Sequence, residues 1–478
     1  MNYSIIRYIL CRVLEFEGIF LLLPCIVALI YREKTGYAFL VTMLACFLIG
    51  AIGKQFKPKS KVFYAKEGFV TVSLSWIVIS MVGALPFYIS GQIPNYVDAL
   101  FETVSGFTTT GGSIVTDLTV LAKCTQFWRL FTHWIGGMGV LVLILAILPL
   151  SGSYNMHLMR AESPGPSVGK LVPKVRNTAM ILYGIYMVIT AFEIVALLIT
   201  GMNPFEAITL SFSTVGTGGF GLAGDSIASC SFAAQSIIII FMILCGINFN
   251  FYYLFLIKRP KEAFKSEEIR VYFLLILVST ALIAWNIRGT FATVFQDFHH
   301  SLLQVSSIIT TTGFASVDYN GWPEFSKAIL FMLTLIGACA GSTGGGFKVS
   351  RLVVLFKSIR NEISLVVHPR SVKKVHMDGK MLTEGVTRSI RVYLIIYVLV
   401  YLISFLLISL DNFDFTTNFT AIAANLNNVG PGLNLVGPAG GYAEFSVFSK
   451  LVLIFDMITG RLEFLPMLVL LTPKTWKK

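Results

Sequence analysis

Long apolar segments alternate with short, partly polar segments along almost the whole chain. The first two apolar segments, residues 5–31 and 37–53, predict a hairpin of two spanning helices, because about 20 apolar residues suffice to cross a bilayer. After residue 66 one unit occurs four times: a long helix, a short semi-apolar helix, a turn rich in Thr, Asn and Gly, and a second long helix. The predicted units are an N-terminal two-helix hairpin at residues 1–66 and four repeats at 67–177, 178–265, 266–385 and 386–478.

The turn in each repeat is the part that predicts chemistry. Backbone carbonyls exposed at membrane depth must be satisfied by protein or water, and a circle of carbonyls can replace the hydration shell of a cation. Glycine permits a positive φ and the close approach that such a circle needs. The predicted cation-binding residues are Thr109, Thr110 and Gly111; Thr214, Val215 and Gly216; Thr311, Thr312 and Gly313; and Asn428, Val429 and Gly430. Four copies can close around one axis, which predicts an all-α polytopic membrane protein with one pore.

The second long helix of each repeat is predicted to be continuous in three cases and broken in one. Continuous helices are expected at 128–149, 231–257 and 445–471. The helix that begins near Phe325 is interrupted by the run of Gly, Ser and Thr at 337–346. Close helix packing around two or three glycines is the alternative explanation, but this density favours unwound backbone inside the membrane. We therefore predict a movable loop beneath the turns.

Arg461 is a charged residue that the pattern places inside the membrane. It lies about 16 residues into the last long helix, roughly 24 Å from its outer end. A charge at that depth is costly unless it faces a wet interior, and Glu463, two residues away, would point elsewhere on a helix. Snorkelling to the inner surface would need a long reach. We predict that Arg461 points into the pore, repels cations and contacts the loop, so the predicted gate residues are Gly341, Gly344, Gly345, Gly346 and Arg461.

Composition and charge support a membrane protein and indicate its orientation. Hydrophobic residues make up 55% of the chain and charged residues 13%, with a mean hydropathy of +0.76; a soluble domain carries nearly twice that charge. The net charge of +12 is concentrated in particular loops, which is typical of membrane topology and not of nucleic-acid binding. The alternation predicts ten spanning helices in the lipid bilayer, both termini in the cytoplasm, and four turns that enter from outside.

Other kinds of chemistry find little support in the sequence. No nucleophile–base set or metal-ligand cluster appears, so we predict neither an enzyme nor a cofactor. Residues 216–221 fit G-x-G-x-x-G but follow a membrane helix where a dinucleotide site needs a strand. Cys124 and Cys230 fall in predicted outer loops, and whether they pair is left open. The main alternative function is a coupled secondary transporter of another cation or small solute, which typically uses inverted repeats, whereas these four share one orientation.

The four turns together resemble those of a known family. The segments at 105–111, 212–216, 309–316 and 425–432 are similar to the turns of the Trk/Ktr/HKT potassium transporters. The two additional N-terminal helices make the chain resemble the bacterial TrkH type within that superfamily. The segment Gly460-Arg461-Leu462-Glu463 resembles the one that carries the pore arginine of that type.

The resemblance implies a function and an assembly. It implies potassium uptake by a homodimer in the bacterial cytoplasmic membrane, with one pore per protomer and a filter at Gly111, Gly216, Gly313 and Gly430. No turn reads Thr-Val-Gly-Tyr-Gly, so looser selectivity for potassium is expected than in a strict potassium channel. The resemblance also implies a TrkA-like cytoplasmic nucleotide-binding ring that controls opening. The basic residues Arg370, Lys373, Lys374 and Lys380 are predicted to help dock that ring.

Overall fold

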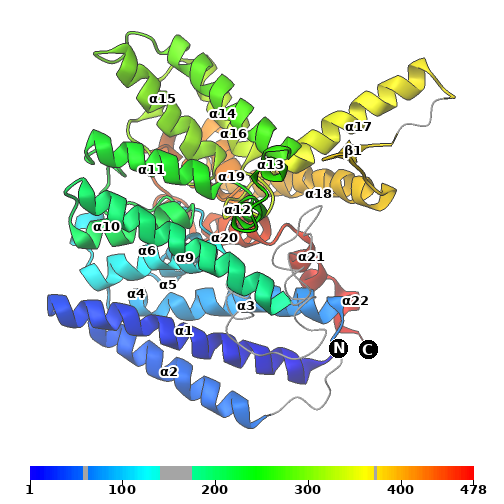
Figure 1. The fold of residues 1–478 in the computed structure, drawn as a ribbon. Helices are drawn as coiled ribbons and strands as arrows, with labels where there is room; N and C mark the ends of the chain where they lie inside the picture. Colours follow the sequence, from blue (N-terminus) through cyan, green and yellow to red (C-terminus); the bar gives the residue numbers. More distant parts are fainter. Residues whose placement is uncertain (57–62, 140–174, 371–373, 478) are drawn as a thin grey trace.

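The computed structural model describes residues 1–56, 63–139, 175–370 and 374–477, whose regular structure is almost all α-helical (Figure 1). The exception among them is a small antiparallel hairpin of β1 (His376–Met377) and β2 (Lys380–Met381), which pairs His376 with Met381. The fold is therefore helical, as the hydropathy pattern predicts.

The N-terminal pair of helices packs closely along one edge of the molecule (Figure 1). These helices are α1 (Tyr3–Tyr31) and α2 (Gly36–Gln55), at the positions that the apolar pattern predicts. Small residues allow the two backbones to approach: Gly18 of α1 packs on Cys46, and Gly53 of α2 leaves no room for a Cβ beside Cys11.

Each later part of the chain contains a long helix, a short helix and a further helix. The long helices are α3 (Ala65–Gly83), continued by α4 (Leu85–Ile89), α9 (Val175–Ile199), α14 (Glu267–Asn286) and α18 (Glu384–Ile408). The short helices are α5 (Tyr96–Phe107), α10 (Pro204–Val215), α15 (Val294–Ile309) and α19 (Phe415–Leu426). The helices that follow them are α6 (Lys123–Gly137), α11 (Phe232–Cys245), α16 (Glu324–Ile336) and α20 (Val447–Arg461).

The short helices all begin at a capped residue. The side chains of Asn95, Asn203, Thr293 and Asp414 each accept a hydrogen bond from a backbone N–H of the first turn that follows. Such a cap typically contributes about 1 kcal/mol, because the first N–H groups of a helix have no partner within it. The cap fixes where each short helix starts, and so fixes where the following turn lies.

The helices after the second, third and fourth turns are broken, and the prediction that those at 231–257 and 445–471 are continuous is wrong. The first divides into α11 and α12 (Phe249–Leu256), which are bent by 87°. The second divides into α20 and α21 (Leu465–Leu471), separated by positive φ angles at Glu463 and Phe464. The predicted break after α16 is observed, and the chain resumes as α17 (Val349–Val367). Helix α6 ends at Gly137, and the rest of the helix predicted at 128–149 lies largely outside the described residues.

The breaks are stable because the backbone groups left without partners in one broken helix form hydrogen bonds with those of another. The Cys339 N–H donates to the Gly246 carbonyl at 3.1 Å, and the Phe249 N–H donates to the Gly341 carbonyl at 2.9 Å. Unsatisfied backbone groups are too costly inside a bilayer for a break to stand alone. Two broken helices thus satisfy each other, which a pattern read one segment at a time does not reveal.

These breaks also change the number of continuous spans. Within the described ranges, six helices are long and apolar enough to cross a membrane, or seven if α11 and α12 count as one bent span. The predicted ten included uninterrupted second helices, which are not found in this part of the chain. Cys124 and Cys230 are both free, so the disulfide left open by the sequence does not form in the structure.

Two further short helices lie at different places in the fold. They are α13 (Pro260–Phe264), which precedes α14, and α22 (Pro473–Trp476), near the C-terminus. The 3₁₀ turns among the described residues are η1 (Leu118–Val120), η2 (Tyr319–Gly321), η3 (Ser409–Asp411) and η4 (Asn434–Val436).

Candidate functional site

Four loops with the same backbone conformation follow the four short helices. Two residues after each helix ends, φ is positive, at 55° for Thr109, 53° for Thr217, 58° for Thr311 and 55° for Asn428. Two residues farther on, φ is positive again, at 79° for Gly111, 83° for Gly219, 86° for Gly313 and 91° for Gly430. We call these last four the ring glycines, and the segments 108–111, 216–219, 310–313 and 427–430 the ring loops.

The second ring loop corrects the alignment predicted from the sequence. Thr214 and Val215 are still helical, and Gly216 caps α10 with φ −68°, so this triplet does not match the other three. The matching residues are Thr217, Gly218 and Gly219. The prediction chose the first glycine after the helix, whereas three glycines follow within four residues.

A feature of the sequence could have given the correct alignment. The capping residues Asn95, Asn203 and Asp414 each stand 16 residues before a ring glycine (111−95, 219−203 and 430−414). In the third repeat the capping residue Thr293 stands 20 residues before Gly313, so the count aligns the second loop with the first and fourth but does not extend to the third. The residues predicted in the other three turns, Thr109 to Gly111, Thr311 to Gly313 and Asn428 to Gly430, do lie in equivalent positions.

The four ring loops contact one another in a closed circle. A Cβ added to Gly111 would lie 2.0 Å from the carbonyl oxygen of Gly218 in the second loop, and one on Gly219 would lie 1.9 Å from that of Thr312 in the third. A Cβ on Gly313 would lie 2.1 Å from the Val429 oxygen, and one on Gly430 would lie 2.4 Å from the Thr110 oxygen. In every case the oxygen belongs to the residue just before the next ring glycine. Glycine is thus required both by its φ and by the neighbouring carbonyl.

Side-chain hydrogen bonds support the loops from behind. The hydroxyls of Thr108 and Thr110 lie 2.8 Å apart, as do those of Thr310 and Thr312. The Asn428 amide donates to the Thr110 hydroxyl at 3.0 Å and to the Met457 carbonyl at 2.9 Å, so it joins the fourth loop to the first. These groups are fully buried, and their hydrogen bonds limit the freedom of the circle.

A buried ion pair, which sequence reasoning missed, connects the ends of the first and second ring loops. Arg129 on α6 pairs with Glu102 on α5, and both side chains are almost fully buried. The Glu102 carboxylate also accepts from the Ile114 N–H at 2.9 Å, while Arg129 donates to the Gly221 carbonyl at 2.9 Å. Removing one partner of a buried pair typically costs about 3–5 kcal/mol, so the pair strongly constrains this side of the circle.

The unwound segment at 337–348, here called the intramembrane loop, lies against the third and fourth ring loops. The Gly345 N–H donates to the Thr311 hydroxyl at 2.6 Å. A Cβ on Gly344 would lie 2.7 Å from the Thr310 oxygen, and one on Gly345 would collide with the Asn427 oxygen. Of the predicted gate glycines, Gly344 and Gly345 are therefore in direct contact with the candidate site, whereas Gly341 lies beside Asn248 and Gly346 beside Gly337.

Arg461 contacts the intramembrane loop, as predicted. Its guanidinium donates to the Thr343 carbonyl at 2.8 Å and to the carbonyls of Gly136 and Gly137, both at 2.6 Å. Glu463, two residues later, accepts from Arg351 on α17. Arg461 thus bridges the intramembrane loop and the end of α6.

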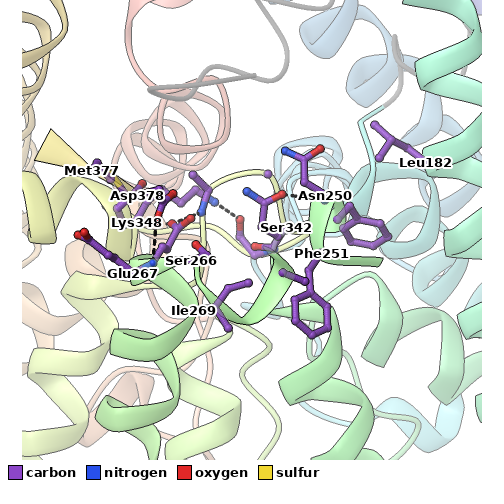
Figure 2. Close-up of a pocket in the computed structure, with 18 of the residues that line it drawn as sticks. Leu182, Asn250, Phe251, Ser266, Glu267, Ile269, Ser342, Lys348, Met377 and Asp378 are labelled. Atoms are coloured by element: carbon purple, nitrogen blue, oxygen red, sulfur yellow. Dashed lines mark hydrogen bonds between the residues drawn. The ribbon is translucent and has the colours of Figure 1, made fainter. Parts of the chain in front are cut away.

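A cavity of about 790 Å³ lies beside this loop, between α12, α14 and the β-hairpin. Arg461, Gly344 and Lys348 contribute to its lining. Figure 2 shows Lys348, Glu267 and Asp378 grouped on one side of the cavity, with Asn250 and Phe251 on the other. Lys348 donates to the Gly344 carbonyl, which places a second basic group at the loop.

Glu268 joins the intramembrane loop to the first turn of α17, and the sequence did not identify it. One oxygen of its buried carboxylate accepts from the Ala340 N–H at 2.7 Å and from the Ser350 N–H at 3.1 Å. The preceding residue, Glu267, donates its N–H to Asp378 at the tip of the β-hairpin at 2.7 Å. The start of α14 therefore joins the loop to the hairpin.

The chain is similar to known cation transport proteins in both sequence and structure. A family described as "TrkH: Cation transport protein" matches residues 35–478. The chain is 36% identical to the Trk system potassium uptake protein TrkH of Vibrio parahaemolyticus and to that of Escherichia coli K12, with 99% of each chain aligned in both cases. It is 32% identical to the Trk system potassium uptake protein TrkG of E. coli K12 over 100% of both chains. The crystal structure of the potassium transporter TrkH from V. parahaemolyticus matches with a TM-score of 0.89 and 32% identity, covering 100% of both chains.

Proposed function

Because the chain belongs to the TrkH family of cation transport proteins, we propose that it takes up potassium through a pore lined by the four ring loops. The observation that carries this proposal is the closed circle, in which each ring glycine packs on the carbonyl of the next loop. Four such loops in one chain form one pore per protomer. The proposed filter residues are Thr109, Thr110 and Gly111; Thr217, Gly218 and Gly219; Thr311, Thr312 and Gly313; and Asn428, Val429 and Gly430.

The circle suits a cation for two electrostatic reasons. The carbonyl oxygens of Thr110, Gly218, Thr312 and Val429 belong to the contacts that close it, and such oxygens can replace water around a potassium ion. All four short helices also end at the circle with their C-termini, the negative ends of their dipoles. A neutral backbone that binds a cation weakly at several points lets the ion leave as well as enter.

The intramembrane loop and Arg461 form the proposed gate. The loop packs on the third and fourth ring loops, and the Arg461 guanidinium ties it to α6. A positive charge at this position repels a cation that leaves the circle. Opening then requires the loop to move and the three hydrogen bonds of Arg461 to Thr343, Gly136 and Gly137 to rearrange.

The proposed setting is a bacterial cytoplasmic membrane, with both termini in the cytoplasm. The proposed assembly is a homodimer with a TrkA-like nucleotide-binding ring on the cytoplasmic side. Arg370, Lys374 and Lys380 are exposed near the β-hairpin, which suits a docking role, and Lys373 lies outside the described residues. The hairpin also connects to the intramembrane loop through Asp378, Glu267 and Glu268, so a docked partner would have a path to the gate.

Replacing any ring glycine with Ala is expected to damage potassium discrimination. The Cβ would both strain a positive φ and collide with the carbonyl of the next loop. The φ strain alone costs about 1–2 kcal/mol, which corresponds to roughly a tenfold change in an equilibrium constant such as that for cation binding. The measurement is potassium flux into liposomes with sodium as competitor, for Gly111→Ala, Gly219→Ala, Gly313→Ala and Gly430→Ala. Gly224→Ala is the control, because a Cβ there meets open space. Wild-type discrimination in all four folded variants would remove the filter assignment.

Arg461→Ala is expected to raise potassium flux in the absence of any partner, by about tenfold if the charge contributes 1.4 kcal/mol to the barrier. Arg461→Lys keeps the positive charge but loses the planar guanidinium that hydrogen-bonds several carbonyls at once. Comparing it with Arg461→Ala therefore distinguishes repulsion of the cation from anchoring of the loop. Single-channel recording at matched protein amounts measures both variants, with Arg360→Ala on the exposed face of α17 as control. Equal open probability and conductance in wild type and Arg461→Ala would contradict the role of Arg461 in the gate.

Reversing the charges of Arg370, Lys374 and Lys380 to Glu is expected to weaken co-purification with the cytoplasmic ring, because complementary charge favours docking. The matched control reverses three exposed basic residues predicted on the outer side, Arg32, Lys34 and Arg288. Binding should fall only in the first variant, and its difference from wild type should shrink as salt increases, because salt screens exposed charges. Equal recovery of the ring by both variants across low and moderate salt would exclude this surface.

A further inference from the structure

The second ring loop lacks the side chains that support the other three. In the first and third loops, paired threonine hydroxyls brace the turn at Thr108 and Thr110 and at Thr310 and Thr312. The fourth loop has Asn427 and Val429 at these positions. The second loop has Gly216 and Gly218, which supply no side chain at all.

His133 occupies the space that those two side chains would need. It lies on α6, in the preceding repeat, and is completely buried. A Cβ on Gly218 would fall 1.4 Å from His133 Nδ1, inside the imidazole, and a Cβ on Gly216 would lie 2.5 Å from the His133 carbonyl oxygen. Gly216 and Gly218 are the equivalents of Thr108 and Thr110. The space that side chains at these two positions would need is therefore occupied by the imidazole and the backbone of His133.

The imidazole is itself held at both ends of the second ring loop. Its Nδ1 lies 3.3 Å from the Ser213 hydroxyl, near the end of α10. Its ring stacks on Phe220, the residue after the ring glycine, with a centroid distance of 4.2 Å. Phe220 also lies 3.7 Å beneath the Arg129 guanidinium. These contacts on either side of residues 216–219 leave the imidazole little freedom to move.

We propose that His133 is a specificity-determining positioning residue of the cation filter. Its imidazole replaces the missing side chains of the second ring loop and so fixes the carbonyl of Gly218, which packs on Gly111 of the first loop. This inference rests on the proposed filter and adds to it a residue that belongs to no ring loop. Without the imidazole, the Gly-rich loop could relax into the vacated space, which would change the size of the circle and its preference among monovalent cations.

A compensating pair of substitutions tests the proposal. His133→Ala should conduct with a potassium-to-sodium flux ratio about tenfold lower, within the range by which small changes in a binding pocket alter discrimination. Gly218→Thr alone should lose flux or fail to fold, because its Cβ would lie inside the imidazole. His133→Ala combined with Gly218→Thr rebuilds the Thr of the first and third loops in the vacated space. This double variant should recover most of the wild-type ratio.

The controls separate positioning from general stability and from failure of the proposed function. His368→Ala removes an exposed histidine after α17 and should leave the ratio unchanged. Thermal stabilisation by KCl compared with NaCl, measured in detergent, reports cation preference without transport, and His133→Asn serves if His133→Ala does not fold. A folded His133 variant with the wild-type ratio, or a double variant no more selective than His133→Ala, would overturn the role of His133. A wild-type protein that neither moves potassium nor is stabilised by it would instead refute the proposed function.

Discussion

The fold depends on the contact between each ring glycine and the carbonyl oxygen of the next ring loop. There is no space for a Cβ at any of the four contacts, so the loops can close only with glycine at these positions. The capped short helices fix where each turn lies. The buried Glu102–Arg129 pair and the Asn428 amide join neighbouring ring loops. The circle is thus fixed by packing and hydrogen bonds that extend well beyond the four turns. We infer that such rigidity is what selection between similar cations requires.

The broken helices follow from the same constraint. The break between α16 and α17 lets the intramembrane loop pack on the third and fourth ring loops. The backbone groups of Gly246 and Phe249, freed by the break between α11 and α12, bond with Cys339 and Gly341 of that loop. Arg461 then satisfies three further carbonyls, including that of Thr343. The same residues that satisfy the unwound backbone would therefore form the barrier of the proposed gate.

Much of this organisation could be predicted from the sequence, because its determinants are local. Apolar runs predicted the long helices, the Gly-rich run predicted the intramembrane loop, and the cost of a buried charge predicted the contact of Arg461 with that loop. The second turn was misaligned by three residues, since Gly216 looked like the ring glycine and only the helix end distinguishes Gly219. His133 and Glu268 were missed because each acts on a segment far away in the sequence.

The central claim, that the four ring loops form one cation site, is tested most directly by locating the ion. The measurement is an anomalous difference map from crystals of the protein grown with rubidium in place of potassium, with a parallel crystal in sodium. Rubidium density is expected within the circle bounded by the carbonyl oxygens of Thr110, Gly218, Thr312 and Val429, and none is expected there in sodium. A well-ordered circle without rubidium density, or rubidium bound only elsewhere in the protein, would contradict the account.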